Sequence, residues 1–157
     1  MHGCWSISER NREDVKVVLD SNVFLVSIPR KSEFRLIFDG LINKEFELVL
    51  STDILNEYAE LIETKANKEV ASHIMEMLLY LENVTLQDIY FKWNLIEADP
   101  DDNKFVDVAI ASGADFLVTE DRHFQALREI KFPFVKVIGI RQFSELISSL
   151  PGNETSF

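Results

Sequence analysis

Short apolar runs alternate along the chain with longer segments in which apolar side chains recur every three or four residues. The short runs have the length and composition of strands that are buried on both faces, and they cover residues 15–19, 46–50, 116–119 and 135–138. The longer segments predict helices over residues 32–44, 69–82 and 102–112. A further helix is expected to start at a cap formed by Ser51 or Thr52. Short helices are expected after each of the last two strands. Residues 84–93 fit either a strand or irregular structure.

This repeated order of strand and helix predicts an α/β fold, in which helices cover both faces of a central, mostly parallel sheet and form a three-layer αβα sandwich. A chain of 157 residues, 46% of them hydrophobic, can build the core of one domain. We place that domain at residues 15–148. It is expected to lie between a loosely ordered N-terminal extension (1–14) and a C-terminal tail (149–157).

The composition indicates the cellular compartment in which this domain works. The single cysteine, Cys4, cannot form an internal disulfide, which is typical of a reducing compartment. Charged residues interrupt the first stretch of the chain, so it does not resemble a secretory signal. No apolar run has the length of a membrane-spanning helix. We therefore expect a cytoplasmic protein that does not associate with membranes.

Four acidic residues stand where the carboxyl ends of the predicted strands should meet. Asp20 and Asp121 come just after two of the strands, Glu57 lies on the helix after the second strand, and Asp102 begins a later helix. Ligands of open α/β sheets bind at this edge. Taken singly, each acid is most simply a turn, cap or solvated residue. Taken together, the four predict a shared site.

Converging carboxylates repel one another, by about 4 kcal/mol for a pair ~4 Å apart at an effective dielectric constant near 20. Bound cations relieve this repulsion, and without them some of the carboxylates should have raised pKa values. Oxygen ligands favour Mg²⁺ or Mn²⁺, whereas the sequence has no cluster of Cys and His with zinc-binding spacing. The acids therefore predict a site for one or two divalent ions.

The formal net charge of −11 opposes binding to nucleic acids, because phosphate binding depends largely on Lys and Arg. Cations held by an acidic pocket would offset this charge locally and could attract phosphate. Basic side chains would add to that effect if they cluster around the pocket. The candidates for such phosphate contacts are Arg30, Lys31, Lys104 and Arg122.

The four acids lie in motifs that resemble those of the PIN-domain ribonucleases, and in particular the branch that contains toxins of type II toxin–antitoxin systems. The motifs are LDSNVFL with Asp20, STDILNEY with Glu57, and DPDDNKFVDVAIASGADFLVTED with Asp102 and Asp121. The resemblance covers roughly residues 15–147. Each motif is weak alone, but their order and spacing make the set specific.

This resemblance implies a PIN-like fold and an endoribonuclease that depends on Mg²⁺ or Mn²⁺ and hydrolyses phosphodiester bonds of RNA. It implies that the catalytic metal ligands are Asp20, Glu57, Asp102 and Asp121. Side chains expected to support these ligands are Asn22, Thr119, Asn103 and Asp107. The resemblance also implies an antitoxin protein as partner. The unusually apolar helix over residues 69–82, which includes Met75 and Leu79, fits an ordinary core helix. It equally fits a surface that receives the antitoxin or a second copy of the chain, and we expect a homo-oligomer, either a dimer or a tetramer.

Two other functions stay open at this point: a non-catalytic PIN-like module that binds RNA or protein, and a nuclease of RNA maturation without an antitoxin. The chain departs from the family pattern at Glu120, where glycine is common, and in the loop SIPRKSEF (27–34), which lacks the expected glycine. Asp99 and Asp101 are interpreted as solvated or locally structural. His123 could reach the pocket only from the loop after Asp121.

Overall fold

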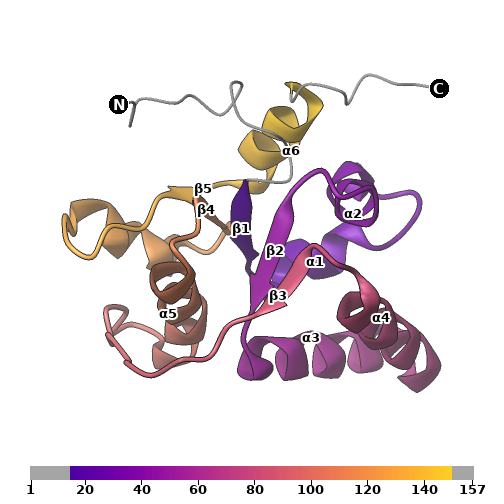
Figure 1. Ribbon diagram of the computed structural model, residues 1–157, viewed down its shortest axis with the longest axis horizontal. Helices are drawn as coiled ribbons and strands as arrows, with labels where there is room; N and C mark the ends of the chain where they lie inside the picture. Colours follow the sequence, from indigo (N-terminus) through magenta and orange to yellow (C-terminus); the bar gives the residue numbers. More distant parts are fainter. Residues whose placement is uncertain (1–14, 150–157) are drawn as a thin grey trace.

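Five parallel strands run through the middle of the computed structural model, which describes residues 15–149 (Figure 1). Along the sheet the strands follow the order β3-β2-β1-β4-β5, and all four neighbouring pairs are parallel. Their bounds are Lys16–Leu19 (β1), Glu47–Leu50 (β2), Val84–Leu86 (β3), Phe116–Val118 (β4) and Val137–Ile138 (β5). The predicted α/β fold with a central parallel sheet is confirmed.

Helices cover both faces of this sheet. Their bounds are Ser21–Ser27 (α1), Arg35–Ile42 (α2), Thr52–Lys65 (α3), Lys68–Tyr80 (α4), Asn103–Ser112 (α5) and Ile140–Ser149 (α6), with 3₁₀ turns at Pro100–Asp102 (η3) and Arg122–Glu129 (η4). One face carries α5, which packs on β1, β2 and β4. Figure 1 shows α1, α2 and α4 on the other side of the sheet, where α1 packs against α2 and α3. None of the helices within residues 15–149 is long and apolar enough to cross a bilayer.

The centre of the core explains why these segments form strands. Val17, Val18 and Leu19 of β1 are fully buried, as expected for a central strand with helices on both faces. Beside this strand, the ring of Phe24 from α1 stacks on Tyr58 from α3 with centroids 4.4 Å apart. The hydroxyl of Tyr58 donates a hydrogen bond of 2.6 Å to the backbone carbonyl of Leu19. These contacts fix the end of β1 and the two helices around it.

The helix ends largely follow the sequence signals. Ser51 caps α3, because its hydroxyl accepts the backbone N–H of Ile54 at 3.3 Å. Gly113 ends α5 in the left-handed conformation with φ of 68°, which glycine adopts without a steric penalty. In the segment that fitted either a strand or irregular structure, only 84–86 is a strand, and no regular element follows until η3.

One element, α1, was not predicted from the apolar pattern. The pattern indicated no helix between the first strand and residue 32, whereas the chain turns into α1 directly after Asp20. Seven residues give too few turns for a clear helical period. The helix is held instead by burial of Val23 and Phe24 and by the carbonyl of Asp20, which accepts the N–H of Phe24 at 3.0 Å. The predicted extension (1–14) and most of the predicted tail (150–157) lie outside the described residues.

Candidate metal centre

The carboxyl ends of β1 and β4 bring Asp20 and Asp121 to the same place. These strands are neighbours, with Leu19 paired to Val118, so the chain leaves both strands side by side. The hydroxyl of Thr119 donates a hydrogen bond of 2.7 Å to Oδ2 of Asp20 and accepts the backbone N–H of Asp121 at 3.0 Å. One buried hydroxyl therefore positions both acidic residues.

Asp102 reaches this place from the other direction, at the start of α5. Its carboxylate forms no capping hydrogen bond to the helix, so its oxygens are left for other partners. Nδ1 of His123 lies 3.4 Å from Oδ2 of Asp102 and 3.2 Å from Oδ1 of Asp121. Contacts through Thr119 and His123 thus connect Asp20, Asp121 and Asp102, which we call the acidic cluster.

The electrostatics of the acidic cluster show the expected strain. The pKa of Asp102 is raised to about 6, first by burial and then by the charges of Asp99, Asp121 and Asp20, while the hydrogen bond with His123 acts in the opposite direction. The pKa of Asp20 is also raised, chiefly by burial, and the hydrogen bond from Thr119 partly offsets this. Without a bound cation, these groups resist ionisation.

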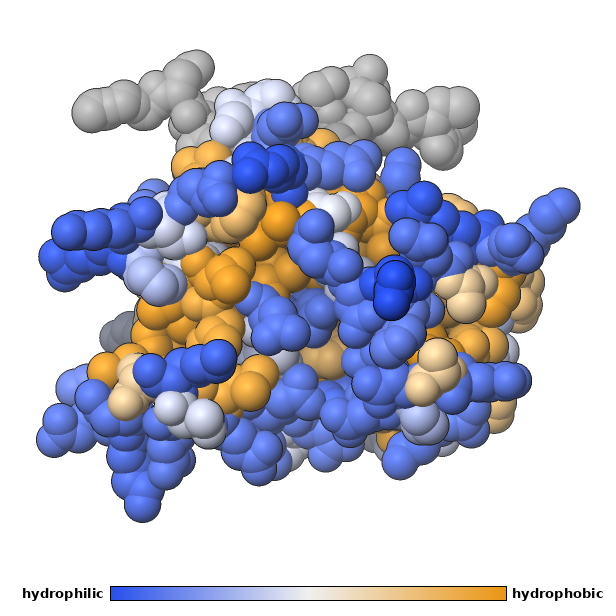
Figure 2. Space-filling view, turned by 180° about the vertical axis from the view of Figure 1, so that it is seen from behind, coloured by the Kyte–Doolittle hydropathy of each residue, from blue (hydrophilic) through white to orange (hydrophobic). Residues whose placement is uncertain are grey.

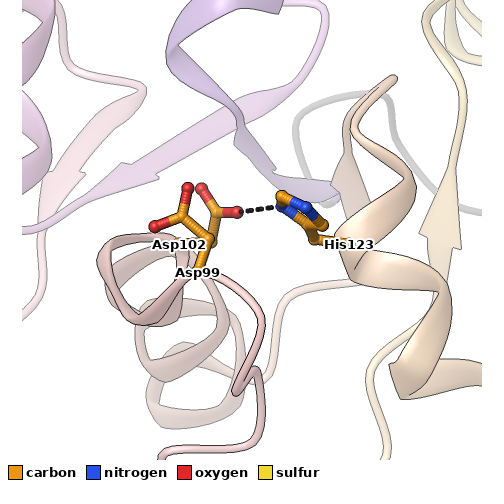
Figure 3. Close-up of side chains that lie close together, drawn as sticks. All are labelled: Asp99, Asp102 and His123. Atoms are coloured by element: carbon orange, nitrogen blue, oxygen red, sulfur yellow. Dashed lines mark hydrogen bonds and ion pairs between the residues drawn. The ribbon is translucent and has the colours of Figure 1, made fainter.

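Two residues that the sequence reasoning set aside lie beside the cluster. Figure 3 shows the carboxylates of Asp99 and Asp102 next to each other, with the imidazole of His123 facing them from η4. Each of the three side chains offers one ligand atom, and these atoms all lie within 4.8 Å of one another. Asp99 also has the expected local structural role, because its Oδ1 accepts the backbone N–H of Asp101 at 3.2 Å and caps η3. The available signal for His123 was its position two residues after Asp121, in a turn that begins at the same edge of the sheet.

Glu57 occupies a neighbouring position rather than contacting the acidic cluster directly. Its Oε1 lies 2.6 Å from Nζ of Lys104, which also pairs with Asp101 at 3.0 Å. Glu57 and Lys104 line a cavity of about 470 Å³ between α3 and the segment 87–100. Both Glu57 and Asp20 act on the hydroxyl of Tyr58, whose pKa is raised by burial and by these two charges.

Residues 16–123 match the PIN domain family. The chain belongs to the PIN domain family. Among curated proteins, none is similar to the chain in sequence. Two solved structures share the fold. One is VapBC2 from Rickettsia felis, solved with a DNA fragment from its promoter. The matching chain is 17% identical, with a TM-score of 0.56, and the match covers 80% of the present chain and 98% of the VapBC2 chain. VapBC-1 from nontypeable Haemophilus influenzae is 15% identical, with a TM-score of 0.54 over 81% of this chain and 99% of that chain. Both neighbours are VapBC toxin–antitoxin complexes.

Within this PIN domain, Asn103 and Asp107 hold a loop and form no hydrogen bond to the acidic cluster. The amide of Asn103 accepts the N–H of Ile96 at 2.8 Å and donates to the carbonyls of Ile96 and Pro100 at 2.9 and 3.1 Å. Oδ1 of Asp107 accepts the N–H of Trp93 at 3.1 Å. Both side chains are buried, and they fasten the irregular segment 87–99 to α5. Asn22, also expected to support the ligands, is exposed, and its backbone N–H stabilises the charged form of Asp20.

The basic residues of the PIN domain surround the site unevenly. Arg30 and Lys31 are exposed in the loop after α1, and Lys104 is engaged by two acids as described. Arg122 lines a small cavity of about 190 Å³ together with Thr119 and Asp121. Arg141, which the sequence did not single out, lines a cavity of about 650 Å³ with Asp20 and Asp121 and pairs with Glu33 at 3.0 Å.

Glu120, the departure from the family pattern, lines the 650 Å³ cavity with Asp20 and Asp121, but its carboxylate already has a partner. Its Oε2 accepts the backbone N–H of Ile140, the first residue of α6, at 2.6 Å. The N-terminus of a helix favours a negative charge. Gly139 makes room for this contact, since a Cβ at that position would lie 2.7 Å from the same oxygen. The local structure therefore stabilises this additional acid.

Proposed function

We propose that this PIN domain is an endoribonuclease that depends on a divalent metal and hydrolyses phosphodiester bonds of RNA. The observation that carries the proposal is the convergence of Asp20, Asp102 and Asp121 at the carboxyl ends of β1 and β4. Membership of the PIN domain family supports it, because family members are typically nucleases.

The donor set fits a hard divalent ion. Carboxylate oxygens predominate, and no ligand sulfur is present among the described residues of the cluster. Asp20, Asp102 and Asp121 would hold the ion, with Asp99 and His123 within reach of the same place. Bound Mg²⁺ or Mn²⁺ would supply water activation and charge neutralisation at the phosphoryl oxygens.

The chain's own residues have separate tasks in this proposal. Thr119 orients the carboxylate of Asp20 and fixes the backbone of Asp121, so the ligand atoms are positioned before any ion binds. Lys104 pairs with Glu57 at the edge of the 470 Å³ cavity and orients its carboxylate, which can accept a hydrogen bond from the attacking water. Arg122 and Arg141, beside Asp121, offer positive charge to the RNA backbone. Attack by water would leave a 5′-phosphate and a 3′-hydroxyl.

The decisive experiment compares cleavage of single-stranded RNA by the wild type and by Asp20→Asn in Mn²⁺ and in EDTA. Removal of one charge from the central ligand should reduce the rate roughly 100-fold or more. Asp39→Asn is the matched control, because Asp39 is exposed on α2 and pairs with Arg35 away from the cluster. Cleavage at the wild-type rate by Asp20→Asn, or in EDTA, would contradict the proposal. Mn²⁺ binding without any cleavage would favour the non-catalytic PIN-like module.

We also propose that the protein is the toxin of a toxin–antitoxin pair and that it self-associates. The VapBC neighbours support an antitoxin partner.

On α4, Leu79 is 60% exposed and Tyr80 is 88% exposed, whereas Met75 packs against the core. Figure 2, which is seen from behind, shows one group of hydrophobic side chains in its left half, and that half corresponds to the right half of Figure 1, where α2 and α4 are drawn. Sedimentation of Leu79→Glu/Tyr80→Glu should show a smaller assembly with unchanged circular dichroism. Unchanged assembly would remove this face from the interface.

A further inference from the structure

Three aromatic rings from two distant segments form a cluster on the side of the molecule that carries α5. Phe91 and Trp93 come from the irregular segment 87–99, and Phe132 comes from the connection between η4 and β5 (Figure 1). The ring centroids are 4.7 Å apart for Phe91 and Trp93 and 6.4 Å apart for Trp93 and Phe132, with edge-to-face geometry in both pairs. We call these three residues the aromatic surface.

The aromatic surface is exposed although large aromatic side chains are normally buried. Phe91 is 62% exposed and Phe132 is 83% exposed, while Trp93 lies half-buried between them. In Figure 2, which is seen from behind, hydrophobic side chains also appear at the right-hand edge, and that side corresponds to the left side of Figure 1, where α5 is drawn. Exposed apolar groups that gather in one place mark a binding surface more often than scattered ones do.

The backbone beneath these rings is fastened to the helix that begins at the acidic cluster. The N–H of Trp93 donates to the buried carboxylate of Asp107, and Ile96 is held on both its backbone groups by Asn103. Because Asp107 and Asn103 belong to α5, the rings keep a fixed position relative to Asp102 at the start of the same helix. A ligand would therefore meet a preorganised surface, which lowers the entropy cost of binding.

The charge around the aromatic surface indicates the nature of that ligand. The residues directly beside the rings in the sequence are basic, since Lys92 lies between Phe91 and Trp93 and Lys131 precedes Phe132. Over the whole segments 87–99 and 128–136 the charges balance, so the positive charge is confined to the immediate neighbours of the rings. Lys92, Arg128 and Lys131 form no salt bridge with any residue in 15–149. Burial raises the pKa of Asp107 and the charge of Lys92 partly offsets this, so Arg128 and Lys131 are the charges left to an anionic ligand.

The aromatic surface is joined to the acidic cluster through α5 and not through a shared cavity, because Trp93 is bonded to Asp107 of the helix that starts at Asp102. Lys92, between Phe91 and Trp93 in the sequence, lines the 470 Å³ cavity with Glu57 and Lys104, whereas Asp20, Asp102 and Asp121 do not line it. A strand of RNA that reaches the acidic cluster could place its bases over the rings and a phosphate near Lys131. Sequence-independent binding of single-stranded nucleic acid combines a basic groove with aromatic side chains on which bases stack.

We propose that the aromatic surface is a stacking platform that binds unpaired bases of the RNA substrate beside the acidic cluster. This inference rests on the proposed ribonuclease function and specifies its substrate class as single-stranded RNA. The platform contributes to substrate binding and takes no part in the chemical step. Paired bases are stacked on each other and cannot lie on the rings, so duplex RNA should not use it.

Binding can be measured apart from cleavage by fluorescence anisotropy of a labelled single-stranded RNA in EDTA. The double variant Phe91→Ala/Phe132→Ala should bind roughly 10-fold or more weakly than the wild type. Leu86→Ala is the matched control, because it removes an apolar side chain that is 49% exposed on β3, and its affinity should be unchanged. Both substituted rings of the double variant are exposed, so circular dichroism should show an intact fold. Duplex RNA of the same sequence should bind equally to all three proteins.

Equal affinity of the wild type and the double variant for single-stranded RNA, or no binding by the wild type, would overturn the platform. Loss of binding to an acidic protein partner alone, with RNA binding intact, would assign the surface to that partner and would also overturn it. Cleavage in Mn²⁺ separates the two proposals. RNA binding that depends on Phe91 and Phe132 without any cleavage would retain the platform and contradict the nuclease. Cleavage that does not depend on these rings would support the nuclease and contradict the platform.

Discussion

Two groups of polar side chains near the start of α5 differ in their hydrogen bonding. Asp102 lies at the N-terminal edge of the helix, among other acids and with no capping hydrogen bond. The next residue, Asn103, and Asp107 further along the helix are buried and bonded to the backbone of the preceding segment, at Trp93, Ile96 and Pro100. The second group stabilises the fold as it stands. The first carries repulsion that a cation would relieve, so similar residue types on one helix serve structure in one place and binding in the other.

The largest effect on stability is expected at Asn103, whose side chain is fully hydrogen-bonded to the backbone. Asn103→Leu removes hydrogen bonds to Ile96 and Pro100 and leaves buried backbone groups unpaired, so the free energy of unfolding should fall by about 2 to 4 kcal/mol. Urea unfolding monitored by circular dichroism measures it. Asp102→Asn, one residue away, is the matched comparison and should not be destabilised without metal. A loss of similar size in both variants would erase the distinction between the two groups.

The next effect concerns the acidic cluster and added metal. Without metal, Asp20→Asn should melt at a higher temperature than the wild type, because one of the mutually repelling charges is gone. With free Mn²⁺ at ~100 times its dissociation constant, the wild type should gain about 2.7 kcal/mol and the variant far less. Differential scanning fluorimetry with and without Mn²⁺ provides both values. A variant that melts well below the wild type in EDTA would show that Asp20 is structural.

A smaller effect should appear in the pH dependence of the metal-free protein. The pKa of Asp102 is about 6 in the folded state, above the usual value of 3.8, so the folded state keeps this proton after the unfolded state has lost it. The resulting stability is present below pH ~4 and is lost as the pH rises through ~6, by about 1 to 2 kcal/mol after allowance for solvent screening. Urea unfolding at several pH values should show this decline in the wild type and a weaker one in Asp102→Asn. Parallel curves would contradict the assigned pKa.

The smallest effect is expected at Glu120, an acid near the cluster that already has a partner. Glu120→Gln keeps the shape but removes the charge that faces the first turn of α6, which should cost about 0.5 to 1 kcal/mol. Metal binding should not change, since Glu120 directs its carboxylate to Ile140 rather than to the cluster. Calorimetric titration with Mn²⁺ checks this point. Markedly tighter or weaker binding would place Glu120 inside the electrostatic field of the site.

Much of this architecture could be predicted from the sequence because it depends on local patterns. Buried parallel strands give short Val-rich runs, and residues just after such strands must meet at one edge, which is why Asp20 and Asp121 were placed correctly. Side-chain geometry could not be predicted in this way. The pairing of Glu57 with Lys104, the approach of Asp99 and His123, and the contact of Trp93 with Phe132 all join segments that no periodicity connects.

The most direct test of the central claim is a crystal soaked in Mn²⁺ and measured by anomalous scattering at the manganese edge. We predict a peak coordinated by carboxylate oxygens of Asp20, Asp102 and Asp121, with Asp99 or His123 as an additional neighbour. The same soak of Asp20→Asn should show a weakened peak or none. No peak at this edge in the wild type, or a peak bound only by acids outside the cluster, would contradict the account.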